Sequence, residues 1–222
     1  MKAAVASIAV LVLSTVAASR LGGWAVVAVV DPPTHLVAGA SNTMDFEVRA
    51  HGQQPQENLK PKVSARSGSH WVLAQTTEVR KGTYRATLNV PSVPRSNEWR
   101  IHVDAGFGRS RGTLLPLRAI GAREAAPQLS DSERGRHLFA AKGCVSCHVH
   151  SAVDIDGEMK KAGPELSNRR FPADYLSRFL ADPTIKATAA ANGWKMPDPK
   201  LRAQEIAALV AFINAPTQLS GR

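Results

Sequence analysis

The stretch Gly143-Cys144-Val145-Ser146-Cys147-His148 decides how the C-terminal part of this 222-residue chain folds. It contains both cysteines of the sequence, separated by two residues, and a histidine follows directly. Thiols at this spacing can each form a thioether to one of the two vinyl groups of a haem, and the adjacent histidine is then carried under the iron. The pattern predicts one haem c per chain, covalent through Cys144 and Cys147, with His148 as the proximal iron ligand.

Two other interpretations of a close cysteine pair fit this chain less well. A structural zinc site needs more cysteines than the chain has. A thiol redox motif is expected beside a βαβ pattern, and the sequence shows none. Because haem c is attached outside the bacterial cytoplasm, the motif also predicts that the chain is exported.

The N-terminus agrees with export. Lys2 precedes an uncharged stretch, and the small residues at 16–18 are typical of a cleavage site. Residues 1–19 are therefore predicted to be a signal peptide. An uncleaved anchor is the alternative, because the uncharged stretch is at the short limit for a membrane span. Both interpretations place the rest of the chain in the periplasm or otherwise outside the cytoplasm, and the second adds membrane association through the N-terminus.

The sixth iron ligand is expected from Met196. Pro197 follows it and biases its backbone away from helical angles, so the thioether can project from an extended loop. Met159 is the rival, but it is close to the motif and two lysines follow it. The ordinary alternative for either methionine is a gap-filling place in a core. The sequence predicts an iron with His148 and Met196 as its axial ligands.

Helical periodicity surrounds the motif from residue 130 onward. Three helices are expected, and turn or capping residues mark their ends. The boundary signals are the pair Ser130 and Glu133 for the first helix, Phe171-Pro172 and Asp182-Pro183 for the second, and Asp198-Pro199 and Asn214 for the third. Residues 130–216 are therefore predicted to be an all-α domain, with 121–129 as a short linker.

Residues 22–120 have a different period. Apolar residues alternate with polar ones in several short runs separated by Pro and Gly turns, which is typical of strands with one buried face. The alternating runs are Met44-Phe46-Val48, Tyr84-Ala86-Leu88-Val90 and Trp99-Ile101-Val103, and residues 24–30 add a continuous apolar run. We expect an antiparallel, immunoglobulin-like all-β sandwich, and so a two-domain chain.

Residues from about 130 to 215 resemble a class I cytochrome c domain. The matching positions are Gly135, Phe139, Gly143-Cys144, Cys147-His148 and the loop Gly163-Pro164-Glu165-Leu166. The resemblance implies that Phe139 lies against the haem and that the Pro164 carbonyl accepts a hydrogen bond from His148 Nδ1. It also implies that the last helix crosses the first at the small Gly135. The distal segment is short for the family, which leaves more of one haem edge exposed.

The N-terminal half resembles the YtkA-like and FixH-like extracytoplasmic domains. The similarity lies in Gly23-Trp24, the stretch 49–52 and Trp99-Arg100-Ile101. These domains have an immunoglobulin-like sandwich, so the resemblance implies a fold and says little about function. We expect this half to dock the haem domain onto a larger complex or to space it from a membrane.

The predicted function is one-electron transfer. A His/Met pair leaves the iron no open position, so the chain is not expected to be an enzyme. Thioether ligation and apolar burial both raise the reduction potential. The residues expected to bury the haem are Phe139, Leu166, Leu176, Phe179, Leu209 and Ile213. The partners are protein donors and acceptors, with the chain as a subunit or partner of a respiratory or other redox complex.

The charge of the chain is consistent with protein partners. Its formal net charge is +10, spread along the sequence, and such a surface favours acidic docking partners. Without a basic stripe, nucleic acid is not an expected partner. The cations expected around the exposed haem edge are Lys142, Arg169, Arg170 and Lys195. They either steer acidic partners or form a solvated ring without a steering role, and the sequence favours neither. His137 and His150 are expected at the surface.

Two other functions remain open from the sequence. A haem-based sensor or ligand-binding module requires Met196 to dissociate. A metal-handling assembly protein would use imidazoles of the β-half, which suit copper and zinc. Those histidines have no metal-binding spacing, so we expect ordinary strand or surface roles for His35, His51, His70 and His102.

Overall fold

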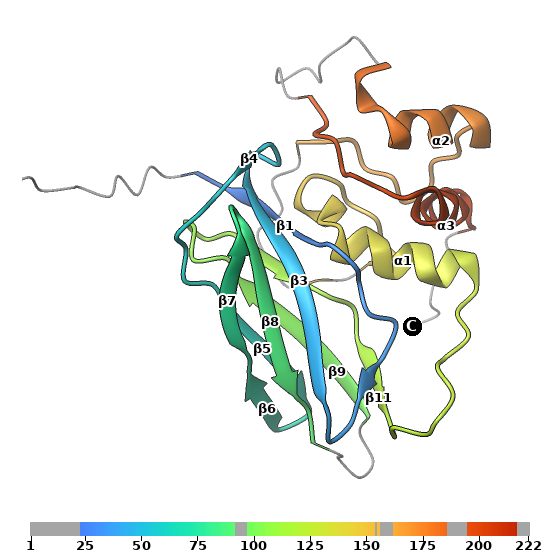
Figure 1. Cartoon of the computed structure of the whole chain (residues 1–222). Helices are drawn as coiled ribbons and strands as arrows, with labels where there is room; N and C mark the ends of the chain where they lie inside the picture. The colour runs from blue at the N-terminus through green and yellow to red at the C-terminus, as the bar shows by residue number, and fades with distance from the viewer. Residues whose placement is uncertain (1–22, 92–96, 154, 156–161, 186–194, 217–222) are drawn as a thin grey trace, which may run out of the picture.

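The computed structural model describes residues 23–91, 97–153, 155, 162–185 and 195–216. An all-β region comes first, and a three-helix region follows it (Figure 1). The predicted leader or anchor, residues 1–19, lies outside the described residues, and so does Met159. Within the described part of the chain, no helix has the length and apolar character that a membrane crossing requires.

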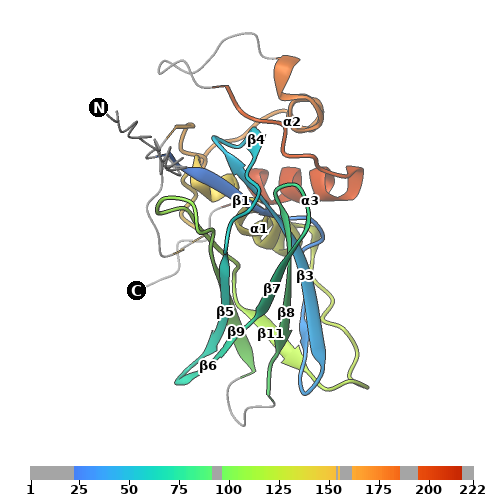
Figure 2. The ribbon, with the colours of Figure 1, turned by 60° about the vertical axis from the view of Figure 1, so that its left-hand side comes forward.

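The β-region consists of two sheets that face one another, with the helices gathered at one end (Figure 2). The first sheet has the strand order β1-β3-β8-β7, and β4 pairs with β3 at one end. All its pairings are antiparallel. Its strands are β1 (Ala25–Val29), β3 (Ser41–Ala50), β4 (Gln54–Pro55), β7 (Gln75–Arg80) and β8 (Thr83–Asn89).

The second sheet has the order β2-β11-β9-β5-β6, and β10 also pairs with β9. One pairing departs from the antiparallel sandwich that was predicted, because β2 and β11 run parallel. Parallel pairing needs a long connection, which the chain between these two strands provides. The strands are β2 (Leu36–Val37), β5 (Lys62–Ser67), β6 (His70–Leu73), β9 (Glu98–Asp104), β10 (Arg111–Thr113) and β11 (Leu117–Ile120).

The core of the sandwich is built from the alternating positions of these strands. The three alternating apolar runs point inward, and Phe46, Tyr84 and Trp99 are the largest fully buried side chains of this core. The Tyr84 hydroxyl donates to the carbonyl of Gln56 at 2.7 Å and accepts from the Leu59 N–H at 3.0 Å. The one polar atom of this buried ring is thus paired, as a buried hydroxyl requires.

The helical region contains α1 (Asp131–Ala141), α2 (Ala173–Ala181) and α3 (Ala203–Asn214), with short 3₁₀ turns at Cys144–Ser146 and Pro183–Ile185. The capping box of Ser130 and Glu133 is present at the start of α1. The third helix begins later than predicted, at Ala203. Instead of capping it, the Asp198 carboxylate accepts the N–H of Lys200 at 2.8 Å. Lys200 has φ 52°, so the chain turns there before the helix starts.

Helices α1 and α3 cross in close contact at Gly135. A Cβ at this position would collide with the Ala208 carbonyl and would lie 2.6 Å from Cβ of Phe212. The crossing that the resemblance implied is therefore present, and only glycine allows the two backbones to approach this closely. Behind it lies a second apolar core that includes Leu138, Leu209 and Phe212.

The two regions share an apolar interface along β1. Strand β1 is buried along its whole length, because one face looks into the sandwich and the other is covered by the helical region. The second core includes Leu115 from the loop before β11, and the first includes Ala141 from the end of α1. Each region thus contributes a buried residue to the core of the other, which fixes their relative orientation.

Candidate functional site

The two cysteines stand on a tight turn at the end of α1. Gly143, with φ 75°, reverses the chain after the helix, and the 3₁₀ turn Cys144–Ser146 follows. The N–H of Cys147 and that of His148 both donate to the carbonyl of Cys144, at 3.1 and 2.9 Å. A Cβ at Gly143 would lie 2.5 Å from Val26 Cγ1, so the turn is seated directly on β1.

Cys144 and Cys147 are both half-buried and are not joined in a disulfide. Burial raises the pKa of the Cys144 thiol to about 12 and that of Cys147 to about 11. Since the thiolate is the nucleophile in thiol exchange, these thiols lack the lowered pKa that is typical of thiol redox motifs. The environment suits an apolar adduct of the two sulfurs instead.

His148 is oriented by the loop that follows the motif. Its Nδ1 lies 3.0 Å from the carbonyl oxygen of Pro164, as expected from the resemblance to class I cytochrome c domains. A carbonyl only accepts, so Nδ1 carries the proton and Nε2 keeps its lone pair. Burial lowers the pKa of His148, although the Pro164 contact opposes this shift. A Cβ at Gly163 would collide with the ring, so glycine is required behind it.

The thiols, His148 and Met196 border one cavity of about 500 Å³. This volume lies within the usual range for cofactor pockets. Met196 is half-buried in an extended segment and packs against the helical core. The cavity also brings together Pro164 and the six side chains expected to bury a haem, namely Phe139, Leu166, Leu176, Phe179, Leu209 and Ile213.

The β-region also contributes to the cavity wall, which the sequence did not indicate. Trp24, His51 and Gln53 line it, next to Pro197 and Asp198. The His51 N–H donates to the Trp24 carbonyl at 3.0 Å, and the two rings meet edge-on with centroids 5.6 Å apart. His51 has φ 52°, because the chain turns sharply between β3 and β4. The cavity is therefore a joint product of both regions.

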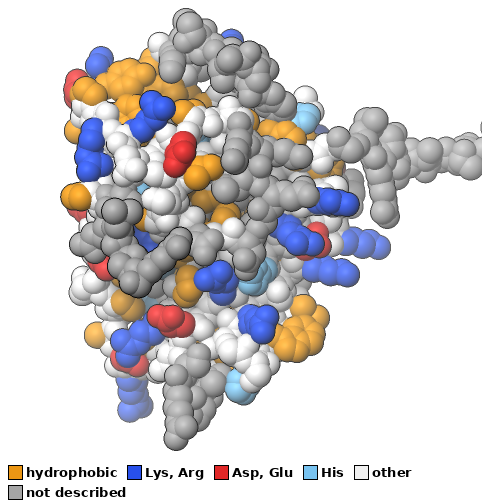
Figure 3. Space-filling view, turned by 180° about the vertical axis from the view of Figure 1, so that it is seen from behind, with side chains coloured by type: hydrophobic (Ala, Val, Ile, Leu, Met, Phe, Trp, Pro, Cys, Tyr) orange, Lys and Arg blue, Asp and Glu red, His pale blue; other side chains and the backbone are white. Residues whose placement is uncertain are grey.

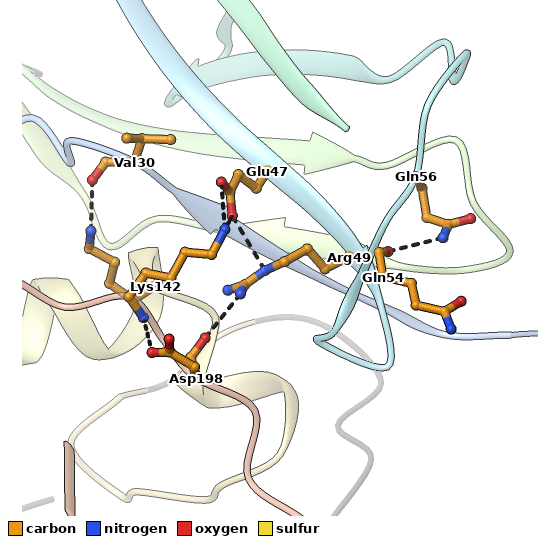
Figure 4. Close-up of polar contacts among 8 residues, drawn as sticks. Val30, Glu47, Arg49, Gln54, Gln56, Lys142 and Asp198 are labelled. Atoms are coloured by element: carbon orange, nitrogen blue, oxygen red, sulfur yellow. Dashed lines mark hydrogen bonds and ion pairs between the residues drawn. The ribbon is translucent and has the colours of Figure 1, made fainter. Parts of the chain in front are cut away.

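Two of the predicted surface positions are wrong. Lys142 does not lie at the cavity edge but is buried, and its ammonium contacts Glu205 at 2.9 Å. The ammonium also donates to the Val30 carbonyl at 2.7 Å (Figure 4). His150 is buried between Phe139 and Phe212, with its ring centroid 4.3 Å from that of Phe212. His137 is half-buried, and burial lowers its pKa.

The remaining predicted edge cations are exposed, and Lys195 lies at the cavity itself. Arg169 donates to the Glu165 carbonyl and Arg170 to that of Ala215, so both are partly fixed by backbone contacts. Seen from behind, Lys and Arg side chains are spread over the face together with Asp and Glu (Figure 3). The surface is basic without a single dominant patch in this view.

Three histidines of the β-region lie in different places and have different neighbours. His35 Nδ1 lies 3.1 Å from the Thr34 hydroxyl, and His102 Nδ1 lies 3.3 Å from that of Thr113. His51 borders the cavity. Within the ranges that the structure describes, no group of three or more His, Cys, Asp or Glu side chains is arranged to hold a metal ion.

Comparison with known proteins identifies the helical region. Residues 132–215 match the family model for cytochrome c, and the search of curated proteins found no match. Among solved structures, the crystal structure of the Lin-41 filamin domain is similar at 10% identity, with 41% of this chain and 81% of that chain covered. Its TM-score of 0.29 is too low to support an argument.

The chain thus combines an all-β region with a cytochrome c domain at its C-terminal end. Its cofactor is haem c, bound covalently through Cys144 and Cys147. The residues present fit this group: two thiols at the attachment spacing, an imidazole with Nε2 available, and an apolar cavity that borders all three. Family members of this kind exchange electrons with protein partners.

Proposed function

We propose that this protein is an extracytoplasmic one-electron carrier in which His148 and Met196 are the axial ligands of the haem iron. The observation that carries the proposal is the convergence of His148, Met196 and both thiols on one apolar cavity. Met196 comes from a segment far from the motif in sequence. A gap-filling methionine would have no reason to border the same cavity as the attachment site.

The chemistry supplied by the bound haem is the one-electron couple between ferric and ferrous iron. The Pro164 carbonyl, through Nδ1–H, orients the His148 ring and makes the imidazole a stronger donor. Met196 fills the sixth position, so no site remains for a substrate and the protein has no catalytic reaction of its own. The thioether and the apolar wall raise the reduction potential, because they disfavour the additional charge of the ferric state.

The partners are proposed to be a protein donor and a protein acceptor with acidic docking surfaces. The chain has a net charge of +10, and exposed Lys195 lies beside the cavity. Complementary charge mainly speeds association and falls with salt. We propose a place in or beside a respiratory or other redox complex of the periplasm, with residues 1–19 as the export signal or as a membrane attachment.

The axial ligand is tested by the spectrum of the oxidised protein. Sulfur ligation gives ferric haem a weak far-red charge-transfer band, which we expect in the wild type and not in Met196→Ala. Met44→Leu is the matched control, because Met44 is buried in the sandwich core and the exchange conserves volume. A wild type without the band, or a band that survives in Met196→Ala, contradicts the proposal.

A further inference from the structure

In the described part of the chain, the segment that carries Met196 is not held in place by secondary structure or by backbone hydrogen bonds. Residues 195–202, here called the Met196 segment, contain neither helix nor strand. Among the described residues, no backbone–backbone hydrogen bond joins 195–201 to the rest of the chain. Such a stretch depends on side-chain contacts for its position. Met196 and Leu201 pack on the helical core, and the polar and close steric contacts come from the sandwich.

The first contact is made by Arg49 of β3. Its guanidinium Nη1 donates to the carbonyl of Asp198 at 3.0 Å, across 149 positions of sequence (Figure 4). Arg49 is only 5% exposed, and Glu47 at 3.4 Å balances its charge. A charged donor in a buried place makes a stronger hydrogen bond than an exposed one. The bond therefore fixes the backbone two residues beyond Met196.

The second contact is steric and involves the residue adjacent to Met196. Pro197 packs on Gly52, in the turn after β3. A Cβ on Gly52 would lie 2.6 Å from Cγ of Pro197 and 3.1 Å from its Cβ. Pro197 and the backbone of Gly52 thus fit together with no room for a methyl group. This contact holds the residue next to Met196 against the turn after β3.

Exposed ion pairs extend the same attachment toward α3. Lys200 reaches both carboxylate oxygens of Glu47 at 3.2 Å, and Arg202 pairs with Asp31 at 2.7 Å. Each exposed pair contributes little by itself. They matter because they connect the same two parts as the contacts of Arg49 and Gly52. All four contacts join the Met196 segment to β3, to the turn after β3, or to the chain that follows β1.

We propose that Arg49 and Gly52 are positioning residues for the axial methionine, so that the β-region keeps Met196 on the iron. This inference rests on the proposed function, since it requires Met196 to be the sixth ligand. In this arrangement the sandwich is a structural part of the redox centre. Loosening its contacts raises the fraction of molecules in which the iron–sulfur bond is open.

The open fraction is measured with free imidazole on the full-length ferric protein. Imidazole binds after Met196 leaves, so an iron–nitrogen bond replaces the iron–sulfur bond without a redox change. The apparent affinity for imidazole is proportional to the open fraction. Arg49→Met removes a hydrogen bond from a charged donor, so we expect the affinity to rise by about tenfold or more. Arg49→Lys keeps a cation and should restore part of the difference.

Two control variants separate positioning from general damage. Arg85 forms a bidentate pair with Asp45 on the same sheet, so Arg85→Met removes a similar pair without touching the Met196 segment. Gly52→Ala is compared with Gly39→Ala, because both glycines have φ +74° but a Cβ at Gly39 meets nothing within 4 Å. The two variants therefore place an alanine at the same positive φ and carry similar backbone strain, and only Gly52→Ala displaces Pro197.

The outcomes are distinguishable. Higher imidazole affinity in Arg49→Met and Gly52→Ala, with Arg85→Met and Gly39→Ala near the wild type, supports the inference. If one of the pair fails to fold, the other decides by itself. If the four variants bind imidazole alike while Met196→Ala loses the far-red band, the inference is overturned and the proposed function stands. If Met196→Ala itself binds imidazole as the wild type does, both are overturned.

Discussion

At the scale of single residues, the His148 ring is the most tightly constrained part of the site. The Pro164 carbonyl accepts a hydrogen bond from its Nδ1, and Gly163 lies against the ring. Both restraints come from the same short loop. The Pro164 contact was expected from the resemblance, whereas the close approach of Gly163 to the ring was not. With His148 as the proposed iron ligand, a ring restrained in this way would present Nε2 to the iron in one orientation, which would limit reorganisation during electron transfer.

Adding a methyl group behind this ring should be costly. In Gly163→Ala the new Cβ would collide with the imidazole, and overpacking of this kind costs about 1–3 kcal/mol. We expect the free energy of unfolding to fall by that amount in guanidinium titrations followed by haem absorbance. Gly121→Ala is the control, because a Cβ there meets nothing within 4 Å. Equal transition midpoints for the two variants would contradict the prediction.

Residue positions that depend on distant packing could not be predicted. His150 follows the motif closely and carries a polar ring, so a surface place was the reasonable expectation. The structure buries it between Phe139 and Phe212, and only the crossing of α1 and α3 creates that space. Trp24 and His51 reach the cavity from the other region of the chain. No local pattern distinguishes them from ordinary strand and turn residues.

At the scale of elements, the boundaries set by local chemistry were predictable and those set by tertiary contacts were not. The caps of α1 and α2 follow their sequence signals. The start of α3 does not, because Asp198 is used in a turn that β3 holds through Arg49. Strands of two or three residues, such as β4 and β10, are too short to show a period of two.

The N-cap of α1 is a test of a locally determined element. Ser130 Oγ accepts the N–H of Glu133 at 3.3 Å, and the Glu133 carboxylate accepts the N–H of Ser130 at 2.9 Å. Ser130→Ala removes half of this exchange and should cost about 1 kcal/mol of unfolding free energy. Ser132→Ala, inside the same helix and without a capping bond, is the control. Thermal melts that give both variants the same stability loss would argue against the cap.

The first turn of α3 contains a carboxylate that contacts both the end of α1 and the residue just before α3. Glu205 is buried and contacts both the Lys142 ammonium and the Arg202 guanidinium at 2.9 Å. Burial alone would raise its pKa, but the hydrogen bonds from Arg202 and Lys142 outweigh that effect and lower the pKa below 4.5. The ionised form is therefore favoured in the folded protein.

This pKa shift makes stability depend on pH in the acid range. A carboxylate with a lowered folded pKa stabilises the protein fully above its unfolded value of 4.5, and this contribution is lost as the pH falls through the folded pKa. Glu205→Gln should flatten that part of a stability–pH curve. At neutral pH it should cost about 3–5 kcal/mol, because Lys142 is left buried without its partner. Parallel curves for the two proteins below pH 4.5 would exclude this role.

At the scale of the whole molecule, a two-part organisation was predictable but the interface between the parts was not. The change of period near residue 130 separates a sandwich from a helical domain. The sequence does contain one signal of this interface. Residues 25–29 read Ala-Val-Val-Ala-Val without alternation, which is typical of a strand buried on both faces. An edge strand with this sequence needs a second partner, and the cytochrome domain is that partner.

The shared cores predict that the two parts unfold together. Denaturant curves followed by haem absorbance and by the far-ultraviolet signal of the whole chain should coincide, as in a two-state transition. Val26→Ala, on the interface face of β1 and 5% exposed, should move both curves by about 1–3 kcal/mol. Val79→Ala, which is 39% exposed, should move neither appreciably. Separate transitions for the two signals would mean independent domains.

Burial of β1 on both faces has a consequence for biogenesis. A newly made polypeptide that never receives its haem would have an unfinished helical half, and the apolar surface of β1 around Val26 and Ala28 would then stay exposed. Bare apolar edges attract other chains and invite degradation. We therefore expect cells starved of iron to clear this polypeptide instead of accumulating colourless copies. Its abundance would report how well the maturation machinery is supplied.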